Sequence, residues 1–145
     1  MSDPDLRARA LALLGRREHT RHELARKLSV HADTPEILDA LLESLTEEGL
    51  LSDARAAEAV LRVRSGRHGL LRIRQEFQQR GVPEDVAASA LETAREGELA
   101  SARQVWSKKF SQLPANAEER ARQGRYLQNR GFSLSVIRQV LRSED

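Results

Sequence analysis

The fold is decided by the stretch Phe77-Gln78-Gln79-Arg80-Gly81-Val82, which recurs fifty residues later as Leu127-Gln128-Asn129-Arg130-Gly131-Phe132. A fainter third copy lies forty-nine residues before the first, where Leu28 and Ile37 correspond to Phe77 and Val86. Repetition at this period is typical of stacked supersecondary units, each too small to bury its apolar face alone. The sequence therefore predicts an array of repeats, and such arrays mostly present binding surfaces.

Each repeat is expected to be a bundle of three helices. Leu and Ala dominate the apolar residues, and alternating Val/Ile/Thr runs are absent, which favours helices over strands. Leu70, Ile73 and Phe77 illustrate the helical spacing i, i+3, i+7. We predict an all-α fold of three tandem, helix-turn-helix-like trihelical repeats at residues 1–50, 51–96 and 97–145. The nine predicted helices span residues 6–14, 20–28, 35–48, 53–65, 70–80, 83–95, 98–110, 117–130 and 133–142.

Capping residues and glycines mark the helix ends. Thr20 with Glu23 predicts a capping box, and Asn116 with Glu119 repeats the pattern. A glycine just after a helix commonly adopts a positive φ. Gly81 and Gly131 should do so where the second helix of a repeat turns into the third. Six glycines follow apolar-periodic stretches and are expected to have positive φ: Gly15, Gly49, Gly66, Gly81, Gly97 and Gly131.

Charge is spread unevenly along a chain whose net charge is only +2. Residues 1–50 carry 7 basic and 10 acidic residues, residues 51–82 carry 7 and 3, and residues 83–145 carry 10 and 9. The segment 51–82, which opens the middle repeat, is thus basic and follows an acidic repeat.

One acid-free stretch carries most of the basic charge of the middle repeat. It contains a histidine and five arginines: Arg62, Arg64, Arg67, Arg72 and Arg74. Arginine forks suit phosphates and carboxylates, so a polyanion is one candidate ligand. A solvated helix pair with intrahelical salt bridges, such as Arg72-Glu76-Arg80, explains the pattern equally well. Lys108 and Lys109 end a helix, where the helix dipole alone favours cations, although contact with DNA or an acidic protein is also open.

Catalytic and metal chemistry have no signature here. The chain has no cysteine, and His19 with His22 lacks further ligands at metal-binding spacing. Nucleotide-binding and hydrolase motifs do not occur, and the acidic residues form no catalytic pair. We therefore predict no enzyme, no cofactor and no metal. The acidic start, Met1–Asp5, is not a signal peptide, and no apolar run approaches membrane-spanning length.

Five sequence blocks, in order, resemble the RecX family of bacterial recombinase regulators. They are Arg17–Leu24, Leu51–Arg55, Arg72–Phe77 with Arg80–Val82, Lys108–Phe110, and Leu127–Phe132. The resemblance covers nearly the whole chain. It departs from the family at Ala56, where an aromatic residue is usual, and at Leu70-Leu71, where the family favours a Gly-Pro-x-Arg-Ile-Arg run.

The resemblance implies a cytoplasmic, monomeric regulator with its repeats in an elongated, curved arrangement. It would bind the filament that the RecA recombinase forms on DNA, and it would inhibit or modulate the strand-exchange, ATPase and coprotease activities of that filament. Its cellular roles would be in DNA repair, homologous recombination and the SOS response. It would also bind single- and double-stranded DNA weakly. A transcription factor of tandem helix-turn-helix units and a generic helical scaffold are the alternatives. The residues expected to bind DNA or partner are Arg62, Arg64, Arg67, Arg72, Arg74, Arg80, Lys108, Lys109 and Arg130.

Overall fold

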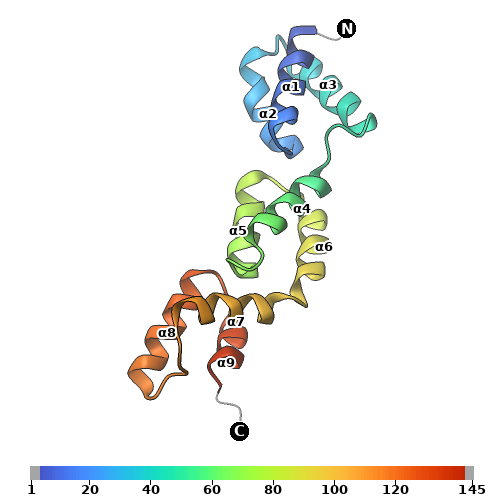
Figure 1. Cartoon of the computed structure of the whole chain (residues 1–145). Coiled ribbons are helices and arrows are strands. Elements are labelled where there is room, and N and C mark those ends of the chain that lie inside the picture. Colours follow the sequence, from blue (N-terminus) through green and yellow to red (C-terminus); the bar gives the residue numbers. More distant parts are fainter. Residues whose placement is uncertain (1–3, 143–145) are drawn as a thin grey trace. The chain divides into compact units, whose positions relative to one another are not determined.

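The computed structural model describes residues 4–142, and within that range every regular element is helical (Figure 1). The predicted all-α class is confirmed, and each predicted helix is present with small shifts of its ends. A short 3₁₀ turn, η1 (Ser29–His31), follows α2. The α-helices are α1 (Pro4–Arg16), α2 (Arg21–Leu28), α3 (Pro35–Glu47), α4 (Asp53–Arg64), α5 (Leu70–Arg80), α6 (Glu84–Arg95), α7 (Glu98–Lys109), α8 (Ala117–Asn129) and α9 (Leu134–Leu141).

The described chain forms two compact units. Unit 1 comprises residues 4–59 and Phe77–Ala87, and unit 2 comprises Val60–Glu76 and residues 88–142. The division falls within α4, α5 and α6, so each unit contains one three-helix bundle and part of the middle repeat. The repeat boundaries at residues 50/51 and 96/97 stay a prediction.

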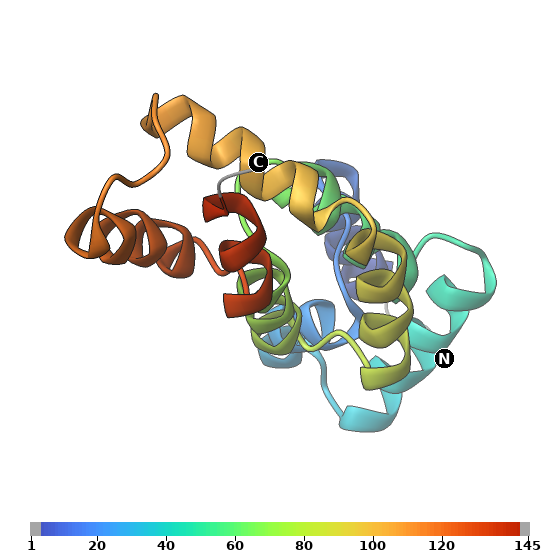
Figure 2. The same ribbon diagram turned by 90° about the horizontal axis from the view of Figure 1, so that it is seen from below.

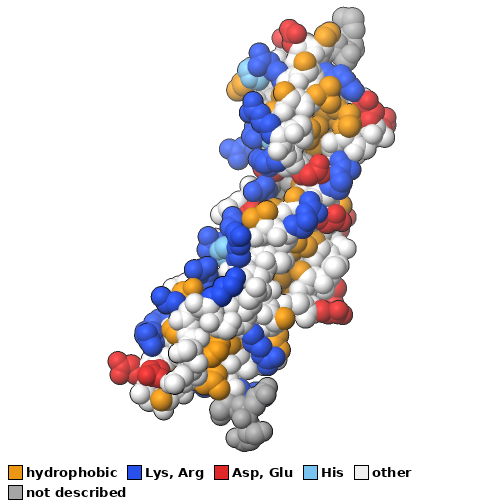
Figure 3. Space-filling view, viewed as in Figure 1, with side chains coloured by type: hydrophobic (Ala, Val, Ile, Leu, Met, Phe, Trp, Pro, Cys, Tyr) orange, Lys and Arg blue, Asp and Glu red, His pale blue; other side chains and the backbone are white. Residues whose placement is uncertain are grey.

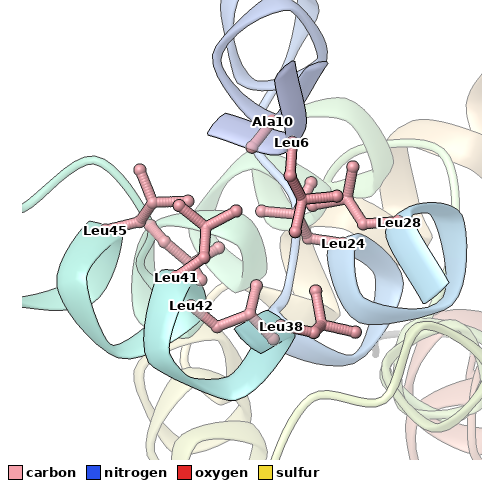
Figure 4. Close-up of a cluster of buried hydrophobic side chains, with 9 residues drawn as sticks. Leu6, Ala10, Leu24, Leu28, Leu38, Leu41, Leu42 and Leu45 are labelled. Carbon is pink, nitrogen blue, oxygen red and sulfur yellow. The ribbon is translucent and has the colours of Figure 1, made fainter. Parts of the chain in front are cut away.

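Unit 1 has a core made almost wholly of leucine (Figure 4). Helices α1, α2 and α3 contact one another through side chains that recur at helical spacing. The complete Thr20–Glu23 capping box starts α2, as predicted, and the Thr34 side chain caps α3. The buried cluster contains Leu6, Ala10, Leu24, Leu28, Leu38, Leu41, Leu42, Leu45 and Leu51.

Unit 2 has a second core, formed by side chains of α7, α8 and α9 and of the turn before α9. Figure 2 shows the ribbons of these three helices in orange to red. Helix α9 contacts both of the others, and Asn116 caps α8 by accepting the Glu119 N–H. The carboxylate of Glu119 bonds to Ala115 N–H rather than to Asn116, so only half of the predicted capping box forms. The buried cluster contains Ala102, Val105, Leu127, Phe132, Ile137, Val140 and Leu141.

The repeated stretch forms the same turn in both units. At its second copy the Phe132 N–H bonds to the Leu127 carbonyl (3.2 Å) and the Gly131 N–H to the Gln128 carbonyl (2.9 Å). At its first copy Val82 bonds to Phe77 (2.9 Å) and Gly81 to Gln78 (3.2 Å). This is the Schellman pattern of helix termination, which requires a left-handed residue. The predicted positive φ is confirmed at 73° for Gly81 and 91° for Gly131.

Two of the six glycine predictions are wrong. Gly15 lies inside α1, which continues to Arg16, and Gly97 has φ −90° as the residue that precedes α7. Neither glycine ends a helix in the left-handed conformation that a Schellman motif requires: Gly15 continues α1, and Gly97 leads into α7. Gly49 and Gly66 do have positive φ, at 77° and 81°.

In unit 1 the glycine turn packs on the first turn of α2. The Arg80 carbonyl accepts a hydrogen bond from the Thr20 hydroxyl, and the Arg21 N–H donates to Asp53 at the start of α4 (2.8 Å). A Cβ added to Gly81 would lie 2.4 Å from the Cβ of His22. We call the packing of the Arg80–Gly81 turn on the first turn of α2 the first interface.

Unit 2 repeats the arrangement at the first turn of α5, and we call this the second interface. The Gly69 N–H bonds to the Arg130 carbonyl (2.8 Å) and the Leu71 N–H to the Gly131 carbonyl (3.1 Å). The Leu70 N–H donates to the carboxylate of Glu98 at the start of α7 (2.9 Å). The free N–H groups of a helix start are thereby satisfied by the following repeat.

Glycine substitutions should separate the cost of the turn from the cost of the interface. A Cβ at Gly131 would lie 2.3 Å from the Arg72 Cβ and 2.7 Å from its backbone nitrogen, whereas one at Gly49 meets open space. We expect Gly49→Ala to lower the free energy of unfolding by about 1–2 kcal/mol, the cost of left-handed alanine. Gly81→Ala and Gly131→Ala should cost clearly more, as measured by urea denaturation.

Gly15→Ala is the control for this series. Its Cβ also meets nothing, and it lies within a helix, so alanine should stabilise the chain by about 0.5–1 kcal/mol. Equal losses for Gly49→Ala and Gly131→Ala would contradict the packing role of the Gly131 turn.

Candidate nucleic-acid interface

The second interface brings together cationic side chains that are far apart in the sequence. Arg64 is the last residue of α4, His68 lies in the following turn, and Arg72 is in the first turns of α5. Arg130 terminates α8 as its C-cap residue. Because the Arg130–Gly131 turn bonds to Gly69 and Leu71, Arg130 is held beside this turn. We call Arg64, His68, Arg72 and Arg130 the basic cluster.

The three arginines of the basic cluster help to lower the pKa of His68. Its pKa is lowered first by burial and then by the positive charges of Arg64, Arg72 and Arg130, with Glu76 acting in the opposite sense. Its Nδ1 atom is buried and has no hydrogen-bond partner among the described residues. Glu76, whose charge opposes this effect, is bonded to the Arg64 Nε at 2.8 Å. The cluster therefore holds a net positive charge around a neutral imidazole.

An aromatic ring extends the basic cluster toward α7. The Arg130 guanidinium donates to the Tyr126 hydroxyl (3.1 Å) and lies 5.1 Å from the ring centroid. The Lys109 ammonium lies 5.7 Å from the same centroid, and Phe110 packs edge-on against the ring at 5.5 Å. Cation–π contacts at these distances hold the two cations near one ring.

The remaining predicted site residues lie apart from these contacts. Four of them are exposed: Arg62 on α4, Arg67 in the turn between α4 and α5, Arg74 on α5 and Lys108 on α7. Arg80 belongs to unit 1, where it lies 3.9 Å from Glu23. On the displayed face of unit 2, Figure 3 shows several Lys and Arg side chains close together, with a histidine among them.

This arrangement suits a polyanion. Arginines supply planar, permanently charged forks for phosphate oxygens, and an aromatic face beside them can accept a nucleobase.

No group of three or more His, Cys, Asp or Glu side chains in the described chain could hold a metal ion. His19 is engaged instead, its Nδ1 donating to the Arg17 carbonyl and its Nε2 accepting from Lys27, both at 3.0 Å. None of the described helices is long and apolar enough to cross a membrane.

Two residues at or beside the basic cluster, His68 and Tyr126, were not predicted as binding residues from the sequence. His68 was not singled out, because its environment depends on Arg130, which is sixty-two residues away and is brought near by the second interface. Tyr126 had a usable signal, since it stands four residues before Arg130 on one helix face.

Family models and relatives identify the chain. Residues 52–91 match the second three-helix domain of RecX, and residues 96–141 match its third three-helix domain. Regulatory protein RecX of Leptothrix cholodnii is 49% identical over 140 residues, covering 97% of this chain and 89% of the relative. The chain belongs to the RecX family. The RecX protein of Chromobacterium violaceum is 47% identical, over 94% of this chain and 88% of its own length.

Solved RecX structures share the fold. The crystal structure of RecX from Lactobacillus salivarius matches with a TM-score of 0.84 at 19% identity, covering 94% of this chain and 92% of that one. A second RecX crystal structure matches with a TM-score of 0.76 at 23% identity, covering 94% of this chain and 73% of its own. RecX is a family of regulatory, non-enzymatic proteins, in agreement with the sequence prediction that the chain is no enzyme.

Binding of a polyanion to the basic cluster should raise the pKa of His68. In the free chain burial and three arginines hold that pKa below its ordinary value, so the imidazole is neutral at pH 7. Phosphates would offset the arginines, and the complex would take up a proton. Affinity for single-stranded DNA should therefore rise as the pH falls below about 6.5, the ordinary value for histidine. NMR titration of the His68 ring with and without oligonucleotide measures the shift directly.

The matching control is His31→Gln, which removes a histidine of unit 1. His68→Gln should reduce the pH dependence of affinity, whereas His31→Gln should leave it unchanged. A His68 pKa that does not move upon saturation with oligonucleotide would place the nucleic acid elsewhere.

Proposed function

We propose that this chain binds the RecA–DNA filament and restrains its growth or activity. The observation that carries the proposal is the 49% identity to a regulatory protein RecX along almost the entire chain. In this proposal the chain acts without catalysis, as a monomer in the cytoplasm. Repeat bundles offer broad surfaces, and a surface of this kind suits the repeating protomers of a filament.

The basic cluster supplies the DNA component of the proposal. Backbone hydrogen bonds from Gly69 and Leu71 hold the Arg130–Gly131 turn against the first turn of α5, which carries Arg72. Tyr126 holds Lys109 and Arg130 beside an aromatic face. Phosphate neutralisation by such groups is insensitive to base sequence and falls steeply with salt. We infer weak, sequence-tolerant contact with single- and double-stranded DNA.

The charge of the chain supports contact with protein, rather than with DNA, as the main source of its affinity for the filament. The net charge is +2, so the chain lacks the strongly basic field of a tight non-specific DNA binder. Acidic residues predominate in residues 1–50 and basic residues in 51–82. A surface of both signs is better matched to a protein filament with DNA inside it than to bare DNA.

A helix-turn-helix transcription factor is the weaker candidate. Such proteins place the start of the last helix of the unit in the major groove. Here α3 begins with exposed Glu36, and α6 begins with exposed Glu84 and Asp85, which would repel phosphates. The basic cluster instead lies at the end of α4, in the turn that follows it, on α5 and at the end of α8.

Comparative binding tests the proposal. At moderate salt the chain should bind preformed RecA filaments on single-stranded DNA about tenfold or more tightly than the same DNA alone, which corresponds to about 1.4 kcal/mol. It should also lower DNA-dependent ATP hydrolysis by RecA. Arg72→Gln/Arg130→Gln should weaken bare-DNA binding more than filament binding, because only part of the filament affinity would come from phosphates.

Arg125→Gln/Arg138→Gln is the control, since it removes the same charge from exposed positions of α8 and α9. Equal affinity for filament and bare DNA, or inhibition that disappears whenever DNA is in excess, would indicate simple competition for DNA and would contradict the proposal.

A further inference from the structure

A basic pocket lies in unit 1, outside the basic cluster. Its volume is about 340 Å³, and it lies between α2 and the end of α5. Six side chains line it: His22, Glu23, Arg26, Lys27, Gln79 and Arg80. We call it the α2 pocket. Of these residues only Arg80 was predicted from the sequence to bind DNA or a partner.

The α2 pocket sits at the first interface, as the basic cluster sits at the second. Arg80 and Arg130 occupy equivalent positions, each next to a turn glycine and each with its carbonyl bonded to the start of a preceding helix. His22 and Arg72 are also equivalent, since each is the residue against which the glycine packs. The repeat therefore brings cationic side chains to the same place in both units.

Glu23, the one acidic residue among the side chains that line the α2 pocket, is ionised and already hydrogen-bonded. Burial raises the pKa of Glu23, but hydrogen bonds from Arg17 and from the Thr20 N–H, with the charges of Arg17 and Arg80, lower it overall. Its carboxylate lies 3.0 Å from Arg17 and 3.0 Å from the Thr20 nitrogen. Glu23 is therefore ionised and bonded to Arg17 and Thr20, and it also lies 3.9 Å from Arg80. Arg26 and Lys27 add positive charge to the pocket beyond this ion pair.

Lys27 is fixed in position rather than free to swing. The buried His19 ring donates to the Arg17 carbonyl through Nδ1, so its Nε2 is the acceptor that holds the Lys27 ammonium at 3.0 Å. An ammonium has three N–H donors, and two are left for a ligand. Arg26 is exposed beside it, and Gln79 adds a neutral amide.

We propose that the α2 pocket binds a phosphate group of a nucleic-acid strand, as a second contact separate from the basic cluster. Arg26, Lys27 and Arg80 supply donors from two helices, which suits the several acceptor oxygens of a phosphate better than the two of a carboxylate. The inference rests on the DNA component of the proposed function and adds unit 1 to it.

Salt dependence of binding tests this proposal. Affinity for a fluorescein-labelled oligothymidylate is measured by anisotropy at several salt concentrations for the full chain and its variants. The slope of log K against log salt falls by about 0.7 for each lost phosphate contact on a single strand. Arg26→Gln/Arg80→Gln should reduce the slope by 0.7 to 1.4 or so. Arg9→Gln/Arg16→Gln, which removes equal charge from exposed positions of α1, should leave it unchanged.

The outcomes separate the α2 pocket from the proposed function. If only Arg72→Gln/Arg130→Gln reduces the slope, the DNA contact of unit 2 stands and the α2 pocket proposal fails. If neither double variant reduces it, both fail. Competition by oligoglutamate that exceeds competition by unlabelled oligothymidylate, and that disappears in Arg26→Gln/Arg80→Gln, would assign the pocket to an acidic peptide and would also overturn the proposal. Circular dichroism melting confirms that each variant is folded.

Discussion

A glycine turn packed against the start of a helix is the contact on which the rest of the structure depends. Helix starts leave backbone N–H groups without partners inside the helix. In unit 2 these groups on α5 are satisfied by the Arg130 and Gly131 carbonyls and by Glu98, all from the next repeat. Only a residue without a Cβ allows this approach, because the Cβ of Gly131 would overlap Arg72. The same contact in unit 1 joins Gly81 to His22.

This packing constraint also determines where charge accumulates. The residue before each turn glycine is arginine, so every interface of this kind carries a guanidinium next to the helix that it caps. In unit 2 the result is Arg130 beside Arg72 and the lowered pKa of His68. In unit 1 the result is Arg80 beside Glu23 at the α2 pocket. A folding contact and a candidate ligand contact are therefore made by adjacent residues of one repeated motif.

The sequence predicts the helices, the caps and the turn glycines well, because each depends on residues within a few positions of one another. Thr20 with Glu23 and the positive φ of Gly131 are of this local kind. The sequence did not predict that Gly131 would pack on Arg72, because that contact is set by tertiary structure. The candidate site was only partly predictable for the same reason: the arginine stretch is visible, but its combination with Arg130, Tyr126 and His68 requires the second interface.

The central claim is that the second interface positions the basic cluster for nucleic acid. A double-mutant cycle on oligothymidylate affinity tests it, combining Gly131→Ala with Arg72→Gln/Arg130→Gln at a temperature where every variant is folded. If the interface positions the arginines, Gly131→Ala weakens binding and the arginine substitutions lose most of their effect in its background. Additive effects, within about 0.3–0.5 kcal/mol, would show that the arginines act independently of the glycine turn and would contradict the account.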